Sequence, residues 1–380
     1  MQIRPDYESK SGGDSVQLLQ TKRCLESLGV AVDISTELEP DLRGYDLVHL
    51  FNLTRVQESC FQARNAMKQD KPIVLSTIYW PFDELASAGG HGIVGFLGKH
   101  LSTDSFERLK AVAKYFVRGE RSRASRYLIT HSFTDMQRET VELSDLCLPN
   151  SETEMRRLIE SLRCHERPYV VVPNAVDLDA AAEASSMDKD EAIEYDLVCV
   201  GRIEPRKNQL ALLKAIAGTS LTLALIGKCA PGQRNYFEAV RRESSLNPNV
   251  RYIESIPNRE IYKLYRKCRV SVQPSWFETP GLASLEAAAM GCAVVVSTGG
   301  TTRDYFGNDA FYCDASNSAS ISSAIKSAIS TGPSKKLEDR VKSDFTWTRA
   351  AEKTLLGYEK AIDLHYGIGN SRISANMTEY

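Results

Sequence analysis

Two glutamates, eight residues apart, are the side chains of this sequence best suited to chemistry. Glu278 falls in a turn signal, and Glu286 lies in an alanine-rich run that predicts a helix over residues 283–290. A helix N-terminus between the two carboxylates offers free N–H groups and a partial positive charge, which suit a phosphate. Carboxylates on either side could accept hydrogen bonds from sugar hydroxyls, which is the layout of a nucleotide sugar. Acidic residues are also common near helix starts, so the pair alone leaves a structural role open.

Two cations follow a strand-like run in the same half of the chain. Arg202 comes directly after the apolar run 198–200, and Lys207 is expected in the first turn of the next helix. An arginine can grip phosphate oxygens with its planar fork, whereas a lysine serves as a compact point charge. A solvated helix start with ordinary salt bridges is the alternative, although a lysine in a first turn opposes the helix macrodipole.

Paired glycines near the amino terminus form a weaker candidate. Gly12 and Gly13 precede Asp14 and a predicted helix that runs to about Leu28. Glycines let the backbone approach a ligand closely, and a helix N-terminus favours an anion. The pair matches neither the glycine pattern of a dinucleotide site nor that of a P-loop, which excludes both. We expect the apolar face of this helix to include Val16, Leu18, Leu19 and Leu25.

The elements that must position these side chains alternate between strand-like and helical patterns along the whole chain. This alternation predicts an α/β fold of parallel sheets with crossover helices, and 380 residues are enough for two domains. Ligands of doubly wound sheets bind outside the carboxyl ends of the strands, so we expect both halves to offer loops to one shared cleft. Strands are predicted at 1–5, 30–34, 45–51, 72–76, 146–149 and 169–172, and then at 197–200, 221–226, 250–253, 270–273 and 293–297.

A polar segment over residues 177–194, without strand character, is the best linker candidate. We therefore expect a Rossmann-like domain over 1–177 and a second one over 178–345. Two helical segments are predicted between Asn317 and about Leu364, and we expect a helix over 346–366 to pack back on the first domain. Residues 367–380 are polar and predict a flexible tail.

The composition excludes several classes of protein. A hydrophobic content of 42%, a charged content of 25% and a net charge of −2 are typical of a soluble globular protein and indicate no nucleic-acid partner. The N-terminus lacks the apolar core of a secretion signal, so we expect a cytoplasmic protein. The nine cysteines form no C-x-x-C pair and the six histidines no H-x-x-x-H spacing, which indicates buried thiols and no metal site. Only Asp188-Lys189-Asp190, in the linker candidate, offers a weak metal-binding string.

Taken together, these residues resemble glycosyltransferase family 4, the retaining enzymes of GT-B fold. Glu278 and Glu286 match the E-x7-E motif of that family, and Gly201-Arg202 with Lys207 matches its strand that ends in Gly-Arg and is followed by a lysine. Residues 171–177 resemble its interdomain phrase, residues 291–295 its G-x-P-V-V strand entry, and Gly12-Gly13 its N-terminal glycine loop. The five partial matches occur in the right order and cover most of the chain.

The resemblance implies transfer of a sugar from a nucleoside-diphosphate donor with retention of the anomeric configuration. It implies catalytic roles for Arg202 and Lys207, which neutralise the diphosphate, and for Glu278, which holds the transferred sugar. It places Glu286 on the ribose and Ile256 near the base, and it requires no metal or other cofactor. The full donor-binding set that it implies is Gly12, Gly13, Arg202, Lys207, Ile256, Glu278, Pro280, Gly281, Leu282 and Glu286.

The sequence also departs from the family pattern. Residues 75–80 read Leu-Ser-Thr-Ile-Tyr-Trp where many members have a histidine, so the usual catalytic histidine does not transfer. The first domain normally binds the acceptor, and its identity is therefore open. We expect a glycan or lipid-linked acceptor and a role in synthesis of a cell-surface polysaccharide, such as lipopolysaccharide, or of a glycolipid. A non-catalytic GT-B module that binds nucleotide or glycan, and a GT-B epimerase, are the alternatives.

A basic stretch over residues 99–126 bears on the acceptor. It carries eight Lys or Arg residues against three acids, interleaved with Phe106, Tyr115 and Phe116. Apolar residues at helical spacing beside a basic face could rest on anionic lipid at the cytoplasmic face of a membrane. A solvated helix is the alternative.

Overall fold

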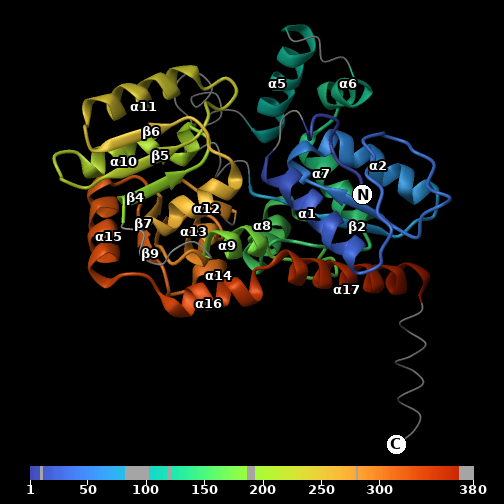
Figure 1. Ribbon diagram of the computed structural model, residues 1–380. Helices are drawn as coiled ribbons and strands as arrows, with labels where there is room; N and C mark the ends of the chain where they lie inside the picture. Colours follow the sequence, from blue (N-terminus) through green and yellow to red (C-terminus); the bar gives the residue numbers. More distant parts are fainter. Residues whose placement is uncertain (9–11, 82–101, 118–121, 186–192, 280, 368–380) are drawn as a thin grey trace, which may run out of the picture. The chain divides into compact units, whose positions relative to one another are not determined.

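The computed structural model describes residues 1–8, 12–81, 102–117, 122–185, 193–279 and 281–367 (Figure 1). These residues fall into two compact units. Unit 1 contains the described residues up to Pro173 together with the helix α17, Trp347–Tyr366. Unit 2 contains the residues from Asn174 to Thr346. The change of unit after Pro173 lies four residues before the boundary that we expected at Asp177.

The sheet of unit 1 has three parallel strands in the order β1-β2-β3. They are β1 (Val48–Phe51), β2 (Ile73–Ser76) and β3 (Leu146–Cys147), and all of their residues are buried. The strands predicted at 1–5, 30–34 and 169–172 are wrong, because only single bridges form there. Gln2 bridges Ser35 and Leu50, and Tyr169 bridges Cys147. Pro5 has no N–H group to continue a ladder, which limits the first of these segments.

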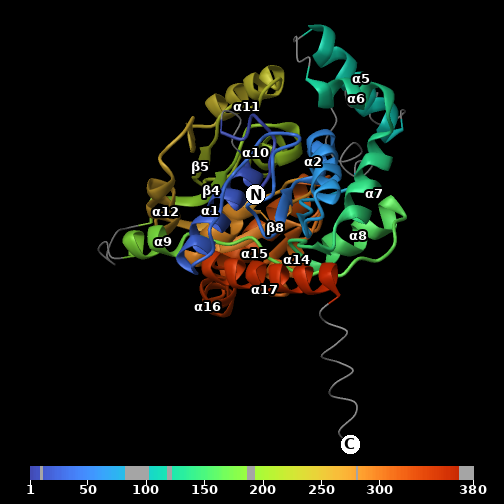
Figure 2. The same ribbon diagram turned by 90° about the vertical axis from the view of Figure 1, so that its right-hand side faces the viewer.

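Helices surround this sheet, and α17 packs against the first helix of the chain, α1 (Gly13–Ser27) (Figure 1, Figure 2). In that first helix Leu18 and Leu25 are fully buried, but Val16 and Leu19 are 38% and 48% exposed, so half of the predicted apolar face is wrong. The buried stripe follows helical spacing through Leu18, Thr21 and Leu25, and Val16 and Leu19 lie outside this stripe. The helices of unit 1 are α1 (Gly13–Ser27), η1 (Leu53–Arg55), α2 (Val56–Lys68), α5 (Thr103–Val117), α6 (Arg123–Thr130), α7 (Phe133–Leu143), α8 (Glu152–Leu162) and α17.

Unit 2 is built on a six-stranded parallel sheet of order β6-β5-β4-β7-β8-β9. The five strands expected in this half are present, and a sixth, β9, was missed because it is only three residues long. The order runs outward in both directions from the neighbours β4 and β7, which makes their carboxyl ends the topological switch point. The strands are β4 (Tyr195–Val200), β5 (Leu223–Ile226), β6 (Val250–Ile253), β7 (Cys268–Gln273), β8 (Ala293–Ser297) and β9 (Phe311–Cys313).

Both faces of this sheet are covered by helices. Leu197 and Cys199 of β4 pack in one apolar cluster with residues of α10, α11 and α15. Val198, between them, packs in another cluster with residues of α12 and α13. Successive side chains of a strand point to opposite faces, so a strand buried on both sides is apolar throughout. The helices are α9 (Leu178–Ser185), η2 (Pro205–Lys207), α10 (Gln209–Ile216), α11 (Arg234–Leu246), α12 (Asn258–Arg266), α13 (Leu282–Ala289), α14 (Thr302–Phe306), α15 (Ser318–Thr331) and α16 (Lys335–Asp344).

Two predictions about connections are corrected. The first part of the linker candidate is the helix α9, whose alanines pack against Tyr262 of α12. The Asp188-Lys189-Asp190 string lies outside the described residues. After Asn317 the chain forms three helices rather than two, because Pro333 follows α15 and Ser334 caps α16. Among the described helices, none is both long and apolar enough to cross a membrane.

Candidate functional site

The predicted cations and the first glutamate meet at the carboxyl ends of β4 and β7. The segment after β4 carries Arg202 and Lys207, and the segment after β7 carries Glu278. Two hydrogen bonds join these segments. The side chain of Gln273 donates to the carbonyl of Val200 at 2.7 Å. The N–H of Trp276 donates to the carbonyl of Arg206 at 2.9 Å. The position is where doubly wound sheets bind their ligands.

Glu278 is buried and ionised. Its side chain is 6% exposed, and Nζ of Lys207 lies 2.5 Å from its Oε1. The hydroxyl of Ser275 donates to the same oxygen at 2.6 Å. Nη1 of Arg206 lies 3.7 Å from the other oxygen, Oε2. Burial alone would raise the pKa of this carboxyl, but the charges of Lys207 and Arg206 outweigh it and hold the pKa below its usual value.

Lys207 lies in a single helical turn, the 3-10 helix η2, and the longer helix α10 begins separately after it. It is the last residue of the turn η2, which begins at Pro205, and α10 starts only at Gln209. Asn208 separates them with a left-handed conformation, φ 58°, and its side chain donates to the carbonyls of Pro274 and Ala315 at 3.1 and 2.8 Å. The turn thus directs Lys207 to Glu278. Arg202, in contrast, is 54% exposed and lies 3.9 Å from Glu204.

Two glycines after β8 hold the backbone of Glu278, and sequence reasoning missed them. The N–H of Glu278 donates to the carbonyl of Gly299 at 3.3 Å, and its carbonyl accepts from Thr301 at 2.9 Å. A Cβ on Gly300 would lie 2.0 Å from the carbonyl oxygen of Glu278, and φ of Gly300 is +92°. Only glycine can adopt this close approach without displacing the site. Paired glycines directly after a buried strand were the signal that could have found them.

The helix α13 begins beside Glu278. Its N-cap is Gly281, at φ 82°, and no side chain of the described residues caps this end. A Cβ on Gly281 would lie 3.7 Å from Cβ of Glu278, so the helix N-terminus and the carboxylate are neighbours. The hydroxyl of Ser284 is buried there without a hydrogen-bond partner in the described residues. Pro280, which the sequence assigned to this turn, lies outside the described residues.

Glu286 lies one turn further along α13 in a different environment. It is half-buried beside Tyr262 and Tyr265 of α12. Burial and the negative charge of Asp177 raise the pKa of Glu286 to about 8, and the two tyrosine hydroxyls offset only part of this. The two glutamates therefore differ in charge at neutral pH: Glu278 is ionised and Glu286 is protonated.

The remaining donor-side residue, Ile256, follows β6. It is half-buried and packs against the apolar cluster that contains Val198, Ile226 and Tyr265. Unit 2 thus carries most of the predicted donor-binding residues, in loops and helical turns that follow the carboxyl ends of its strands. Arg206, Ser275 and the two glycines after β8 are additions that the sequence did not indicate.

Gly12 and Gly13 belong to unit 1. Gly12 is the N-cap of α1 and Gly13 its first residue. Asp14 lies in the first turn, where it accepts the N–H of Ser15 at 2.9 Å and the guanidinium of Arg4 at 2.8 Å. A carboxylate of the chain itself therefore lies at this helix N-terminus, the position that we expected for an external anion.

A second buried carboxylate supports the loop after β2, where family members have a histidine. Glu154 is fully buried and accepts hydrogen bonds from the hydroxyl of Thr77 and from the N–H of Tyr79, the latter at 2.9 Å. Burial raises the pKa of Glu154 to about 7. Ile78, between the two donors, has φ +42°, which is unusual for a β-branched residue. Glu154 therefore holds this loop in a strained conformation.

The basic stretch of unit 1 forms α5 and α6 where it is described. Phe106 is 7% exposed and packs inward, so its predicted place on an apolar outer face is wrong. Leu109 and Phe116, by contrast, are 47% and 71% exposed at i, i+7 spacing. Val112 and Ala113 lie between them on the same side of the helix.

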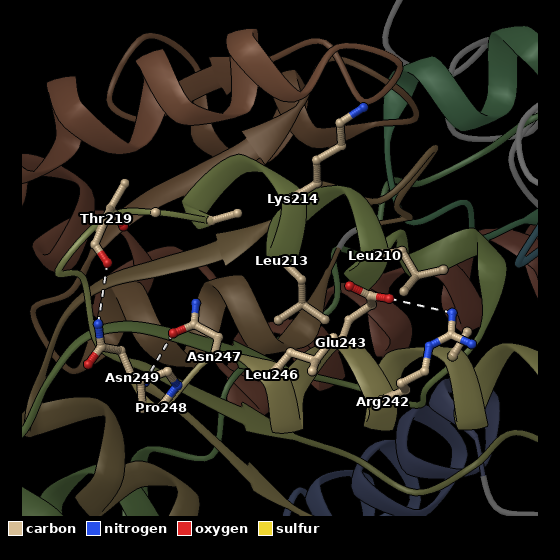
Figure 3. Close-up of a pocket in the computed structure, with 13 residues that line it drawn as sticks. Leu210, Leu213, Lys214, Thr219, Arg242, Glu243, Leu246, Asn247, Pro248 and Asn249 are labelled. Carbon is tan, nitrogen blue, oxygen red and sulfur yellow. Dashed lines mark hydrogen bonds and ion pairs between the residues drawn. The ribbon is translucent and has the colours of Figure 1, made fainter.

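A cavity of about 740 Å³ lies elsewhere in unit 2. Figure 3 shows its lining, with Leu213 and Lys214 from α10 and Arg242 and Leu246 from α11. Asn249, just before β6, also lines it, so the cavity opens at the amino ends of β5 and β6. It contains none of the predicted site residues. Among the described residues, no cluster of three His, Cys, Asp or Glu could hold a metal ion.

Comparison with known proteins finds a family match in the second half of the chain. Residues 186–344 match the family model "Glycosyl transferases group 1". A D-inositol 3-phosphate glycosyltransferase of Pseudarthrobacter chlorophenolicus is 24% identical over 58% of this chain and 57% of its own length. The N-acetylgalactosamine-N,N'-diacetylbacillosaminyl-diphospho-undecaprenol 4-alpha-N-acetylgalactosaminyltransferase of Campylobacter jejuni is 29% identical over 44% of this chain and 46% of its own. The chain thus spans about half the length of these curated relatives.

Solved structures show the fold. Sucrose-phosphate synthase from Thermosynechococcus elongatus matches with a TM-score of 0.64 and 17% identity, over 92% of this chain and 93% of the other. Anabaena Alr3699/HepE in complex with UDP and glucose matches with a TM-score of 0.55 and 14% identity, over 98% of both chains. The α/β fold is therefore GT-B, as predicted. The family resemblance drawn from the sequence is confirmed for residues 186–344, which match the glycosyl transferases group 1 model.

Proposed function

We propose that this protein is a retaining glycosyltransferase that moves a sugar from a nucleoside-diphosphate sugar to a glycan or lipid-linked acceptor, in the synthesis of a cell-surface polysaccharide or glycolipid. One observation carries the proposal. The buried pair of Lys207 and Glu278 lies at the switch point of the unit 2 sheet, next to the uncapped N-terminus of α13. A cation and free N–H groups suit a diphosphate, and an ionised carboxylate suits sugar hydroxyls.

The reaction needs a stabilised leaving group. The bond between the anomeric carbon and the diphosphate oxygen breaks, and the bonding electrons leave with the diphosphate. The acceptor hydroxyl forms the new bond and loses its proton. Arg202, Lys207 and the N–H of Leu282 would meet the charge that develops on the departing phosphate. Fixed donors of this kind, held in place before the reaction, lower the barrier because they need no reorganisation.

The two glutamates take separate roles in this proposal. Glu278, kept ionised by its cations, accepts hydrogen bonds from the transferred sugar. Glu286 accepts the ribose hydroxyls, and Ile256 contacts the base. Because Glu286 is protonated near neutral pH, ribose binding to its ionised form would be coupled to release of a proton.

No metal ion or other cofactor enters the proposed reaction. The positive charges of Arg202 and Lys207 and the partial charge of α13 take the place that a divalent cation has in many phosphate sites. Activity is therefore expected to survive a chelator. A requirement for added magnesium or manganese, removed by the chelator and restored by the ion, would contradict this part.

Binding of nucleoside diphosphates tests the donor site. Thermal denaturation is measured with UDP, GDP and ADP, and the nucleotide that raises the midpoint is then tried as its sugar conjugates. A ligand at about 100 times its Kd stabilises the native state by about 2.7 kcal/mol. Glu278→Ala should abolish sugar release from the conjugate, whereas a non-catalytic module would bind the conjugate and release nothing in the wild type. If none of the three nucleotides raises the midpoint, the donor site is refuted.

We also propose that α5 rests on anionic lipid, which would bring unit 1 to the cytoplasmic face of a membrane. Its outward stripe exposes Leu109 and Phe116, and the exposed cations Arg108 and Lys110 lie beside it. Apolar residues that enter the headgroup region next to cations are typical of interfacial helices. Vesicles that contain phosphatidylglycerol should sediment the protein, and vesicles of phosphatidylcholine alone should not. Leu109→Ser with Phe116→Ser should abolish the difference; equal sedimentation with both lipids would contradict the proposal.

A further inference from the structure

If the proposed function holds, Lys207 interacts with two groups: Glu278 in the free protein and the diphosphate in a donor complex. In the free protein its ammonium lies 2.5 Å from Oε1 of Glu278, whose side chain is only 6% exposed. In a donor complex the same ammonium would turn to the diphosphate. A buried carboxylate that loses its cation is strongly destabilised and tends to take up a proton. A protonated or displaced Glu278 could not accept hydrogen bonds from the sugar in the same way.

Arg206 supplies a second cation at the other oxygen of Glu278. Its Nη1 lies 3.7 Å from Oε2, whereas Lys207 and Ser275 both use Oε1. At this distance Arg206 attracts the carboxylate without occupying a lone pair of Oε2 by a hydrogen bond. Within the described part of the chain, Oε2 therefore remains open to a sugar hydroxyl while it stays next to a positive charge.

The position of Arg206 is fixed by contacts that do not involve Lys207. Glu204 accepts from its Nη2 at 2.8 Å and from its Nε at 3.2 Å. The carbonyl of Phe277 lies 3.4 Å from Nη1, and the guanidinium lies 5.2 Å from the centre of the Phe277 ring. Burial acts to lower the pKa of Arg206, but Glu278 and Glu204 raise it above its usual value, so the cation persists.

We propose that Arg206 is a positioning residue, which keeps Glu278 charged and in place when Lys207 turns to the diphosphate of a donor. The inference rests on the proposed function. It predicts that Arg206 affects the sugar part of a donor and leaves the nucleotide part unaffected. An arginine is needed because its planar fork holds Glu204 through two nitrogens while a third faces Glu278, a geometry that lysine cannot reproduce.

Calorimetric titration tests this with a nucleoside diphosphate and its sugar conjugate. The Kd of the nucleoside diphosphate divided by the Kd of its sugar conjugate measures how much the sugar contributes to binding. Arg206→Ala should lower this ratio about tenfold at pH 7, the effect of one unit of pKa on a titrating group, with Kd of the nucleoside diphosphate unchanged within about twofold. The ratio should recover as the pH rises, because Glu278 then ionises without help. Arg206→Lys should keep part of the ratio, and Arg234→Ala, an exposed arginine of α11, should match the wild type.

Three results would overturn the inference in distinguishable ways. An Arg206→Ala variant in which neither Kd changes would show that Glu278 does not depend on Arg206. Equal weakening of both ligands would show that Arg206 binds the phosphates itself. Absence of nucleotide binding in the wild type would remove the proposed function, and this inference with it.

A second test needs no ligand. Lys207→Ala imitates the departure of Lys207 from Glu278, so the double variant with Arg206→Ala leaves the carboxylate without either cation. Its thermal midpoint should fall by clearly more than the sum of the falls in the two single variants, because either cation alone can keep Glu278 charged. Additive shifts would overturn the inference even if nucleotides bind.

Discussion

Replacing Glu278 with glutamine gives a prediction about stability that follows from its contacts. Glutamine can keep the hydrogen bonds of Ser275 and Lys207, so the change removes mainly one negative charge. Lys207, 13% exposed, then loses its counter-charge, whereas Arg206 keeps Glu204 at 2.8 Å. Removal of one partner of a fully buried pair costs about 3–5 kcal/mol. Because Lys207 is partly exposed and Arg206 stays paired, we expect the free energy of unfolding to fall by about 2 kcal/mol. This corresponds to a fall of about 4–8 °C in the thermal midpoint of unit 2.

The pH dependence identifies the cause. The pKa of Glu278 in the folded protein lies below its usual 4.5, so its stabilising contribution is present above that value and is lost as the pH falls through the folded pKa. The difference between the wild type and Glu278→Gln should therefore be full at pH 7 and shrink as the pH falls below 4.5. Calorimetric scans from pH 3.5 to 8 measure it. Glu238→Gln on α11, which removes an exposed carboxylate paired with Arg234, should change the midpoint little. Equal shifts in the two variants, or a shift independent of pH, would refute the reasoning.

Two further predictions concern the same unit. Gly300→Ala should destabilise unit 2 and abolish nucleotide binding, since its Cβ would lie 2.0 Å from the carbonyl oxygen of Glu278. Gly44→Ala, with no atom within 4 Å of the new Cβ, should do neither in the same thermal and calorimetric assays. Glu286→Gln should raise the thermal midpoint at pH 8 and leave it unchanged at pH 4. The pKa of Glu286 is about 8 in the folded protein and usually 4.5, so this carboxyl increasingly destabilises the folded protein as the pH rises from 4.5 to 8. The proton release proposed for ribose binding implies that nucleotide affinity increases as the pH rises toward 8, and Glu286→Gln should lose this increase. A wild-type thermal midpoint in Glu286→Gln at both pH values would contradict the stability prediction.

The centre of the unit 2 sheet was predictable because its central strands are buried on both faces. Strand β8, for example, is a nearly continuous β-branched run between turns, and its predicted limits match the structure. The segments 1–5 and 169–172 of unit 1 have fewer partners and form single bridges. Local pattern cannot decide between a strand and a bridge, because the neighbour that completes the ladder is distant in sequence.

The candidate site was predictable only where a side chain has a local signal. Glu278 and Glu286 stand at a turn and on a helix, and both were identified. The break between η2 and α10 directly after Lys207 was not predicted, because it arises where Asn208 adopts a left-handed conformation and donates to the carbonyls of Pro274 and Ala315. Those contacts come from segments 66 and 107 residues away, which no local pattern reveals.

The roles of Arg206 and Gly300 depend on contacts between loops in the same way. Arg206 lies 71 positions before Phe277, whose carbonyl it contacts, and nothing in its own sequence neighbourhood distinguishes it from a surface cation. Gly300 matters because the backbone of Glu278 approaches it, which only the folded chain shows.

Calorimetric titration of a nucleoside diphosphate into the wild type and Lys207→Ala tests the central claim most directly. The account places the diphosphate against Lys207 in unit 2, so the wild type should bind one of UDP, GDP and ADP. Loss of a hydrogen-bonded cation from a phosphate site should then raise Kd about tenfold or more. Arg234→Ala should bind like the wild type. Equal affinity in the wild type and Lys207→Ala would contradict the account.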